Sequence, residues 1–168
     1  MKPKSFLSQL SVILRNLANQ LDKKTYKIVY LDDQPSQIIL FESMILSGAE
    51  FQFKGFSSVK YAMPYIRSHA CDLVLLDLQL GAGVADGKWQ AYSLRETPSL
   101  RQVPIVVISQ YIERWRVENR ATAPGLLYYE DDGLLYMTKE QLTQFELITA
   151  LRDILATHTT TDEPAIAA

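Results

Sequence analysis

Five polar side chains are spread through this 168-residue sequence, and each follows or ends a short apolar run. Asp32 and Asp33 follow the first run, Asp77 ends a later one, and Ser109 and Lys139 follow two more. Carboxylates that lie close together raise each other's pKa unless a cation lies among them. Oxygen ligands select hard cations, and Mg²⁺ is typically bound by one or two carboxylates with waters and phosphate oxygens. A carboxylate beside Mg²⁺ can attack a phosphoryl group, so the chemistry that fits is formation of an aspartyl phosphate on Asp77.

Each of these residues also has an ordinary structural explanation. An Asp after a strand is most often a turn residue or a helix cap, and Asp32 or Asp33 could cap a helix that begins near Pro35. Ser109 could bond to the backbone at a strand end, and Lys139 could be a solvated lysine at a helix start. We favour a shared site, because capping explains one residue at a time, whereas these residues recur at the ends of successive apolar runs.

The apolar runs have the pattern of strands in a parallel sheet. The run from Leu73 to Leu76 is uninterrupted, as expected for a strand covered on both faces. Strand alternates with helix five times, which predicts an α/β fold with right-handed crossovers and helices on both faces of the sheet. In such a sheet the functional crevice lies beyond the carboxyl ends of the strands. The predicted strands are 27–31, 51–56, 72–78, 103–109 and 134–137, and the predicted helices are 35–48, 57–68, 88–96, 111–120 and 141–157.

Other segments fall outside this alternation. Residues 1–24 form an amphipathic N-terminal extension, whose helical stripe could pack on its own domain or on a second copy of the chain. Residues 25–157 form the folded domain, and the Thr-rich residues 158–168 form a loose tail. Residues 126–129 form either one side of a local hairpin or part of a long loop. The stripe consists of Leu7, Leu10, Leu14, Leu17 and Leu21.

Composition excludes several classes of protein. Hydrophobic residues make up 48% and charged residues 21%, which is globular rather than disordered composition. The net charge of −2 gives no general attraction to nucleic acid, and we expect no such partner. Cys71 is the only cysteine, which excludes an intrachain disulfide and a thiolate zinc site. No apolar run approaches the length of a membrane span, and the N-terminus makes a poor signal peptide, so we expect a soluble cytoplasmic protein.

The motifs around the five polar residues resemble those of the receiver domain of two-component response regulators, and the chain looks most like the chemotaxis-regulator type. The matching pieces are K-I-V-Y-L-D-D-Q-P at 27–35, D-L-V-L-L-D at 72–77, D-G at 86–87, P-I-V-V-I-S at 104–109 and Y-M-T-K at 136–139. The resemblance covers residues 26–156. It implies a single doubly wound, flavodoxin-like sheet of five parallel strands in the order 2-1-3-4-5, to which this chain adds the N-terminal helix.

The resemblance also implies a role for each residue of the acidic site. Asp77 would accept the phosphoryl group, and Lys139 would bind it. Asp32 and Asp33 would bind Mg²⁺, the one cofactor implied. Asp77 and the backbone carbonyl of Gln79 would complete the metal ligands.

Two further residues would transmit the change to the surface. Ser109 would be the hydroxyl switch residue, and Tyr136 stands where the family keeps an aromatic side chain that changes rotamer. Gln110 departs from the family, because a very small residue is usual there, and the bulky Tyr111 follows it. Both side chains could obstruct water or a partner at the acceptor. The segment 121–133 also makes the last crossover longer than expected.

The leading functional hypothesis is a stand-alone receiver that takes a phosphoryl group on Asp77 from a histidine kinase or a phosphotransfer protein. Its output would be contact with a downstream protein, because only a short tail follows Leu155. It would be no enzyme beyond autodephosphorylation, and the N-terminal helix could form a homodimer. The first alternative is a receiver-like interaction module that works without phosphorylation. The second is a Mg²⁺-dependent aspartyl phosphatase, although Gln79 stands where such enzymes commonly carry an acidic residue.

Overall fold

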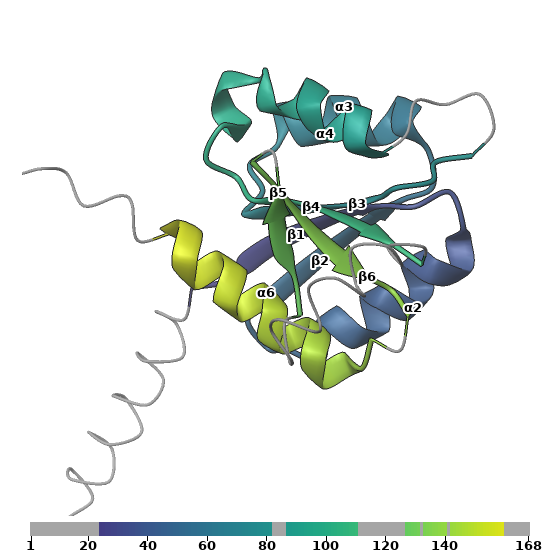
Figure 1. Cartoon of the computed structure of the whole chain (residues 1–168), viewed down its shortest axis with the longest axis vertical. Helices are drawn as coiled ribbons and strands as arrows, with labels where there is room; N and C mark the ends of the chain where they lie inside the picture. Colours follow the sequence, from purple (N-terminus) through teal and green to yellow (C-terminus); the bar gives the residue numbers. More distant parts are fainter. Residues whose placement is uncertain (1–23, 82–86, 111–126, 132, 141, 160–168) are drawn as a thin grey trace, which may run out of the picture.

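A six-stranded, mostly parallel sheet with the strand order β2-β1-β3-β4-β6-β5 forms the centre of the fold (Figure 1). The computed structural model describes residues 24–81, 87–110, 127–131, 133–140 and 142–159. Neighbouring strands run parallel, except that β5 pairs antiparallel with β6. The strands are β1 (Tyr26–Leu31), β2 (Phe51–Phe56), β3 (Leu73–Asp77), β4 (Ile105–Ser109), β5 (Tyr129–Asp131) and β6 (Leu134–Thr138).

Helices cover both faces of the sheet, as the alternation of strand and helix predicts (Figure 1). α2 and α6 pack on one face, and α3 and α4 pack on the other, so that the sheet separates two apolar cores. The helices are α2 (Pro35–Ile45), α3 (Val59–Ser68), α4 (Gly87–Arg95) and α6 (Gln144–Thr159), and the short 3₁₀ helix η1 spans Pro98–Leu100.

β3 shows why the central strands are continuously apolar. Successive side chains of a strand point to opposite faces. Leu73 and Leu75 therefore enter the core beneath α2 and α6, and Val74 and Leu76 enter the core beneath α3 and α4. All four are buried, and each buried side chain of this kind contributes about 1.5–3 kcal/mol to folding. This burial holds the end of β3, and with it Asp77, in a fixed position.

The predicted fold class is confirmed, but the number of strands needs a correction. Five parallel strands occur in the predicted order, and a sixth strand, β5, extends the sheet beyond β6. The hairpin alternative for the run before the last strand is therefore right, with the strand at Tyr129–Asp131 rather than at 126–129. Gly133, directly before β6, has a φ of 70°, a left-handed conformation that favours glycine and suits a tight turn.

Some predictions lie outside the described residues. The N-terminal helix, the helix at 111–120, Tyr111 and most of the tail at 158–168 fall there, so these predictions remain untested. Where the tail was expected to start, α6 continues to Thr159. Within the described residues, no helix is both long enough and apolar enough to cross a membrane.

Candidate functional site

The parallel register brings the five polar residues to one edge of the sheet. Asp32 and Asp33 follow β1, and Asp77 is the last residue of β3, the strand next to β1. Ser109 is the last residue of β4, and Lys139 directly follows β6. Because these four strands are neighbours and run parallel, their carboxyl ends meet. The structure therefore brings together all five residues that the sequence analysis singled out.

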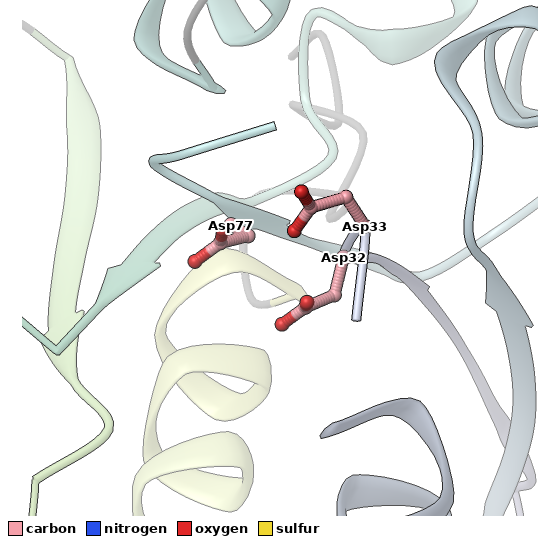
Figure 2. Close-up of side chains that lie close together, drawn as sticks. All are labelled: Asp32, Asp33 and Asp77. Atoms are coloured by element: carbon pink, nitrogen blue, oxygen red, sulfur yellow. The ribbon is translucent and has the colours of Figure 1, made fainter. Parts of the chain in front are cut away.

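The three carboxylates form a compact acidic cluster. One side-chain oxygen from each of Asp32, Asp33 and Asp77 lies within 4.8 Å of the others, and Figure 2 shows the three side chains close together. Asp32 and Asp77 are buried, with 0% and 4% of their surfaces exposed, whereas Asp33 is exposed. Of these three carboxylates, Asp33 is the one that faces solvent. An ion from solution can therefore enter the cluster on the side of Asp33.

Lys139 joins the two buried carboxylates. Its Nζ lies 2.5 Å from Oδ2 of Asp32 and 2.7 Å from Oδ1 of Asp77, and only 5% of its side chain is exposed. The backbone N–H of Lys139 donates to the carbonyl of Ser109 at 2.8 Å, which fixes the lysine at the end of β4. A buried charge without a partner is unstable, so this ammonium group compensates the two carboxylates in the absence of another cation.

Asp32 is held by a residue that the sequence analysis missed. The hydroxyl of Tyr30 donates to Oδ2 of Asp32, and the backbone N–H of Gln34 donates to Oδ1 at 2.9 Å. Tyr30 is fully buried, and its ring lies 4.7 Å from that of Phe41 in α2. Burial, reinforced by the negative charge of Asp32, raises the pKa of Tyr30, so the phenol stays protonated and remains a donor. The signal in the sequence was the spacing, because residues two apart on a strand share a face.

The surroundings of Asp77 change the pKa of its carboxyl group. Burial raises the pKa of Asp77 above its ordinary value of 3.8, and the charge of Asp32 adds to this effect. The Lys139 ammonium and a 3.1 Å hydrogen bond from the N–H of Gln79 oppose it only in part. A carboxylate with a raised pKa is more basic, and a cation placed beside it would favour its charged form.

Two glycines give the loop after β3 room to approach the acidic cluster. A Cβ atom on Gly87 would lie 1.9 Å from the carbonyl oxygen of Asp77, so no larger residue fits there without displacing the backbone. Gly81 has a φ of 83°, and a Cβ atom there would lie 3.1 Å from Oδ2 of Asp33. Both glycines were visible in the sequence, but their closeness to Asp33 and Asp77 was not.

Ser109 and Tyr136 approach the same edge from the other face of the sheet. Tyr136 belongs to the core beneath α3 and α4, whereas Tyr30 belongs to the core beneath α2 and α6. By the alternation of side chains, Ser109 shares a face with Val107 of that same core. Ser109 is 1% exposed and stays at the strand end beside Lys139.

Tyr136 is enclosed by the additional strand. The ring of Tyr129, on β5, stacks on it with centroids 4.9 Å apart and planes 13° from parallel. The hydroxyl of Tyr136 is buried, and the ammonium of Lys88, on α4, acts on it. Burial raises the pKa of Tyr136, and the ammonium of Lys88, 5.8 Å from the ring centroid, lowers it in part.

Of the bulky pair that departs from the family pattern, Gln110 lies within the described residues, where it follows Ser109 and is exposed. Gln79, the predicted carbonyl ligand, is exposed two residues beyond Asp77. The N–H of Gln79 bonds to Asp77, which places this residue beside the acidic cluster.

The donor set fits a hard divalent cation. It consists of three carboxylates whose oxygens converge, and two of them are already held in place by hydrogen bonds. Mg²⁺ is typically held by one or two carboxylates while keeping several waters, and no sulphur or imidazole ligand competes among the residues of the cluster. The residues present therefore suit Mg²⁺.

Comparison with solved structures identifies the fold. A response regulator receiver protein from Sinorhizobium medicae is 26% identical, with a TM-score of 0.60 over 80% of this chain and 97% of that one. The receiver domain of a sensor histidine kinase from Pseudomonas aeruginosa, which has a magnesium ion coordinated in its active-site cleft, is 21% identical. Its TM-score is 0.61 over 79% of this chain and 98% of that one.

A chemotaxis response regulator from Vibrio cholerae gives the same result. It is 14% identical, with a TM-score of 0.59 over 78% of this chain and 99% of that one. No protein-family model matches the sequence, and no curated protein matches it. The chain therefore has the fold of response regulator receiver domains, and the resemblance predicted from the motifs is confirmed at the level of the fold.

Proposed function

We propose that this chain forms a receiver domain that accepts a phosphoryl group on Asp77 from a histidine kinase or a phosphotransfer protein. The observation that carries the proposal is the arrangement around Asp77. Its carboxylate lies 2.7 Å from the Lys139 ammonium and within 4.8 Å of two further carboxylates. Two of the three carboxylates, those of Asp32 and Asp77, are buried, where a charge is stable only with a cation beside it.

The transfer would use Asp77, Lys139 and the two neighbouring carboxylates. An oxygen of the Asp77 carboxylate attacks phosphorus, the bond from phosphorus to the histidine nitrogen of the donor breaks, and its electron pair stays on that nitrogen. Asp32, Asp33 and Asp77, with the Gln79 carbonyl, would hold Mg²⁺, which neutralises the charge of the transferred group. Phosphorylation would add about −1.5 to −2 charges beside Asp77, and Lys139 can turn from the carboxylates to a phosphoryl oxygen.

The consequences would spread along β4 and β6. Lys139 is tied by its backbone N–H to the carbonyl of Ser109, so a shift of the lysine acts on the end of β4. Ser109 would then donate its hydroxyl to a phosphoryl oxygen, and Tyr136 on the same face would respond. Output would be contact with a downstream protein, in the cytoplasm, and any turnover would be limited to autodephosphorylation.

A receiver-like module that works without phosphorylation is the second candidate. The stacking of Tyr129 on Tyr136 favours it, because this contact restrains an aromatic side chain that receivers are expected to move. A phosphatase has no comparable support, since the residue two positions after Asp77 is Gln79, which carries an amide and not a carboxylic acid.

Phosphorylation from a small donor separates these candidates. The protein is incubated with Mg²⁺ and acetyl phosphate, and its intact mass is measured. We expect the mass of one added phosphoryl group in the wild type and none in Asp77→Asn. Asp72→Asn is the matched control, because Asp72 lies at the other end of β3 and accepts the N–H of Lys27 at 2.7 Å, which an amide oxygen can also do.

The control variant should be modified like the wild type. A folded wild-type protein that gains no mass would overturn the proposal and leave the phosphorylation-independent module. If Asp77→Asn is modified to the same extent as the wild type, another residue accepts the phosphoryl group.

A further inference from the structure

The outer face of α2 is apolar, although it points to solvent in the described part of the chain. Phe41, Met44 and Ile45 face the core. On the opposite side Ile39 is 66% exposed, and Leu46, directly after the helix, is 50% exposed. Single exposed apolar residues are ordinary, but a helix that is apolar on both sides is typical of one that is covered on both sides.

The polar residues on this face do little to hydrate it. Ser43 donates its hydroxyl back to the carbonyl of Leu40 at 2.7 Å, and Ser47 donates to Met44 at 2.5 Å. Leu40 is 48% exposed beside Ile39, and Glu42 is the only charged residue of α2. The outer face of α2, comprising Ile39, Leu40 and Leu46, is thus a site that a second apolar surface can cover.

The N-terminal segment enters the domain near the carboxyl end of α2. The N–H of Tyr26 donates to the carbonyl of Glu50 at 2.8 Å, which places the start of β1 next to the turn that follows α2. Residues 1–23 precede this point and contain the leucine stripe that ends at Leu21. Only residues 22–25 lie between the stripe and β1, so the stripe is tethered close to Leu46.

We infer that the leucine stripe of residues 5–21 packs on the outer face of α2 in the same molecule. A helix of 17 residues is about 25 Å long, whereas the 11 residues of α2 span about 16 Å, so the stripe is long enough to cover the face. The tether lies at the carboxyl end of α2, so the two helices run parallel. Leu14 and Leu21 are seven residues apart, as are Ile39 and Leu46, which gives both surfaces the same spacing.

The tether favours the same molecule over a second copy. A short linker gives an effective concentration in the millimolar range, which a dimer reaches only at high protein concentration. The proposal concerns α2 and the N-terminal segment alone, so it stands whether or not Asp77 is phosphorylated. Because α2 begins directly after the acidic pair, at Pro35, covering this helix would also steady the element next to the site.

Disulfide trapping in the full chain tests the proposal. Leu14→Cys and Ile39→Cys are introduced together in a Cys71→Ala background, and the bridged fraction is followed under mild oxidation by mass spectrometry and non-reducing gels. A disulfide needs Cα atoms about 4.4–6.8 Å apart, so the bridge reports packing. Asn16→Cys with Ile39→Cys is the matched control, because residue 16 has nearly the same tether length but lies on the opposite side of the predicted helix.

We expect the Leu14 pair to form an intramolecular bridge at least tenfold faster than the Asn16 pair. Equal rates for the two pairs would overturn the proposal, since an undocked tail samples both positions alike. A bridged dimer as the main product would assign the face to a second copy and would also overturn it. Hydrogen exchange gives a readout without cysteines: Leu14→Asp with Leu17→Asp should speed exchange in α2 tenfold and leave α3 unchanged, and unchanged exchange in α2 would contradict docking.

Discussion

The two faces of the sheet differ in the contacts that their side chains make at the acidic site. On the face beneath α2 and α6, Tyr30, Asp32, Asp77 and Lys139 form a network in which charges and hydrogen bonds are paired. On the face beneath α3 and α4, the hydroxyl of Tyr136 is buried, the ring of Tyr129 stacks on the tyrosine, and the ammonium of Lys88 lies 5.8 Å from its ring centroid. The first face holds its charges in buried pairs, whereas the second holds Tyr136 mainly by packing. The following substitutions test that difference in order of decreasing effect.

Lys139→Ala should have the largest effect. It would leave two buried carboxylates without their cation, and removing one partner of a buried pair costs about 3–5 kcal/mol of unfolding free energy. Urea denaturation of the variant measures the loss, and added Mg²⁺ should restore part of it. Lys27→Ala, which removes an exposed lysine, should change stability by less than about 0.5 kcal/mol. A loss below about 1 kcal/mol for Lys139→Ala would show that the network is not what stabilises this side.

Two tyrosine substitutions compare the faces directly. Tyr30→Phe removes a hydrogen bond to a charged group and should cost about 1.5–3 kcal/mol. Tyr136→Phe removes a hydroxyl that interacts with the half-exposed Lys88 rather than with a buried charge, so it should cost less, about 0.5 kcal/mol. The same urea titration serves both variants. Equal losses would abolish the distinction between a paired face and a packed face.

Tyr129→Ala tests whether the additional strand, β5, encloses Tyr136. Loss of the stack on Tyr136 should cost about 1 kcal/mol, because such aromatic pairs contribute about 0.5–1.5 kcal/mol beyond their buried area. Near-UV circular dichroism should change at the same time, since the environment of Tyr136 changes. Tyr61→Ala is the comparison, because Tyr61 on α3 is 65% exposed. If both variants lose the same stability, β5 does not enclose Tyr136 in solution.

The pH dependence of Asp77 is the smallest effect. Its pKa is raised in the folded state, so it binds a proton at a higher pH than in the unfolded chain. This group therefore stabilises the fold as the pH falls, and its contribution is lost as the pH rises through the folded-state pKa. Carbon NMR of the side-chain carboxyl should give a midpoint above 3.8 without metal and a lower one with Mg²⁺. A metal-free midpoint at or below 3.8 would mean that Lys139 outweighs burial.

The sequence was sufficient where a local pattern determines the structure. The uninterrupted run of β3 predicts a doubly covered strand, and the polar residues at successive strand ends predict their meeting at one edge. The three carboxylates and Lys139 followed from that rule and from the family resemblance. These features depend on chain order and strand direction, both of which the sequence displays.

The remaining features depend on contacts between distant segments. Tyr30 looked like an ordinary core residue, because a shared strand face shows that Tyr30 and Asp32 are neighbours but not that the hydroxyl donates to the carboxylate. β5 was left open between a hairpin and a loop, because three residues carry too little pattern to show pairing. The need for glycine at position 87 likewise depends on the approach of its backbone to the carbonyl of Asp77, ten residues earlier in the chain.

Fluorine NMR of the protein with beryllofluoride, a phosphoryl mimic, is the decisive experiment for the acidic site. If Asp32, Asp33, Asp77 and Lys139 form one phosphoryl site around a divalent ion, bound fluoride resonances should appear with Mg²⁺ and vanish on chelation. They should also be absent in Asp77→Asn and present in Asp72→Asn. A folded wild-type protein with no bound resonance, or an equal resonance in Asp77→Asn, would contradict the account.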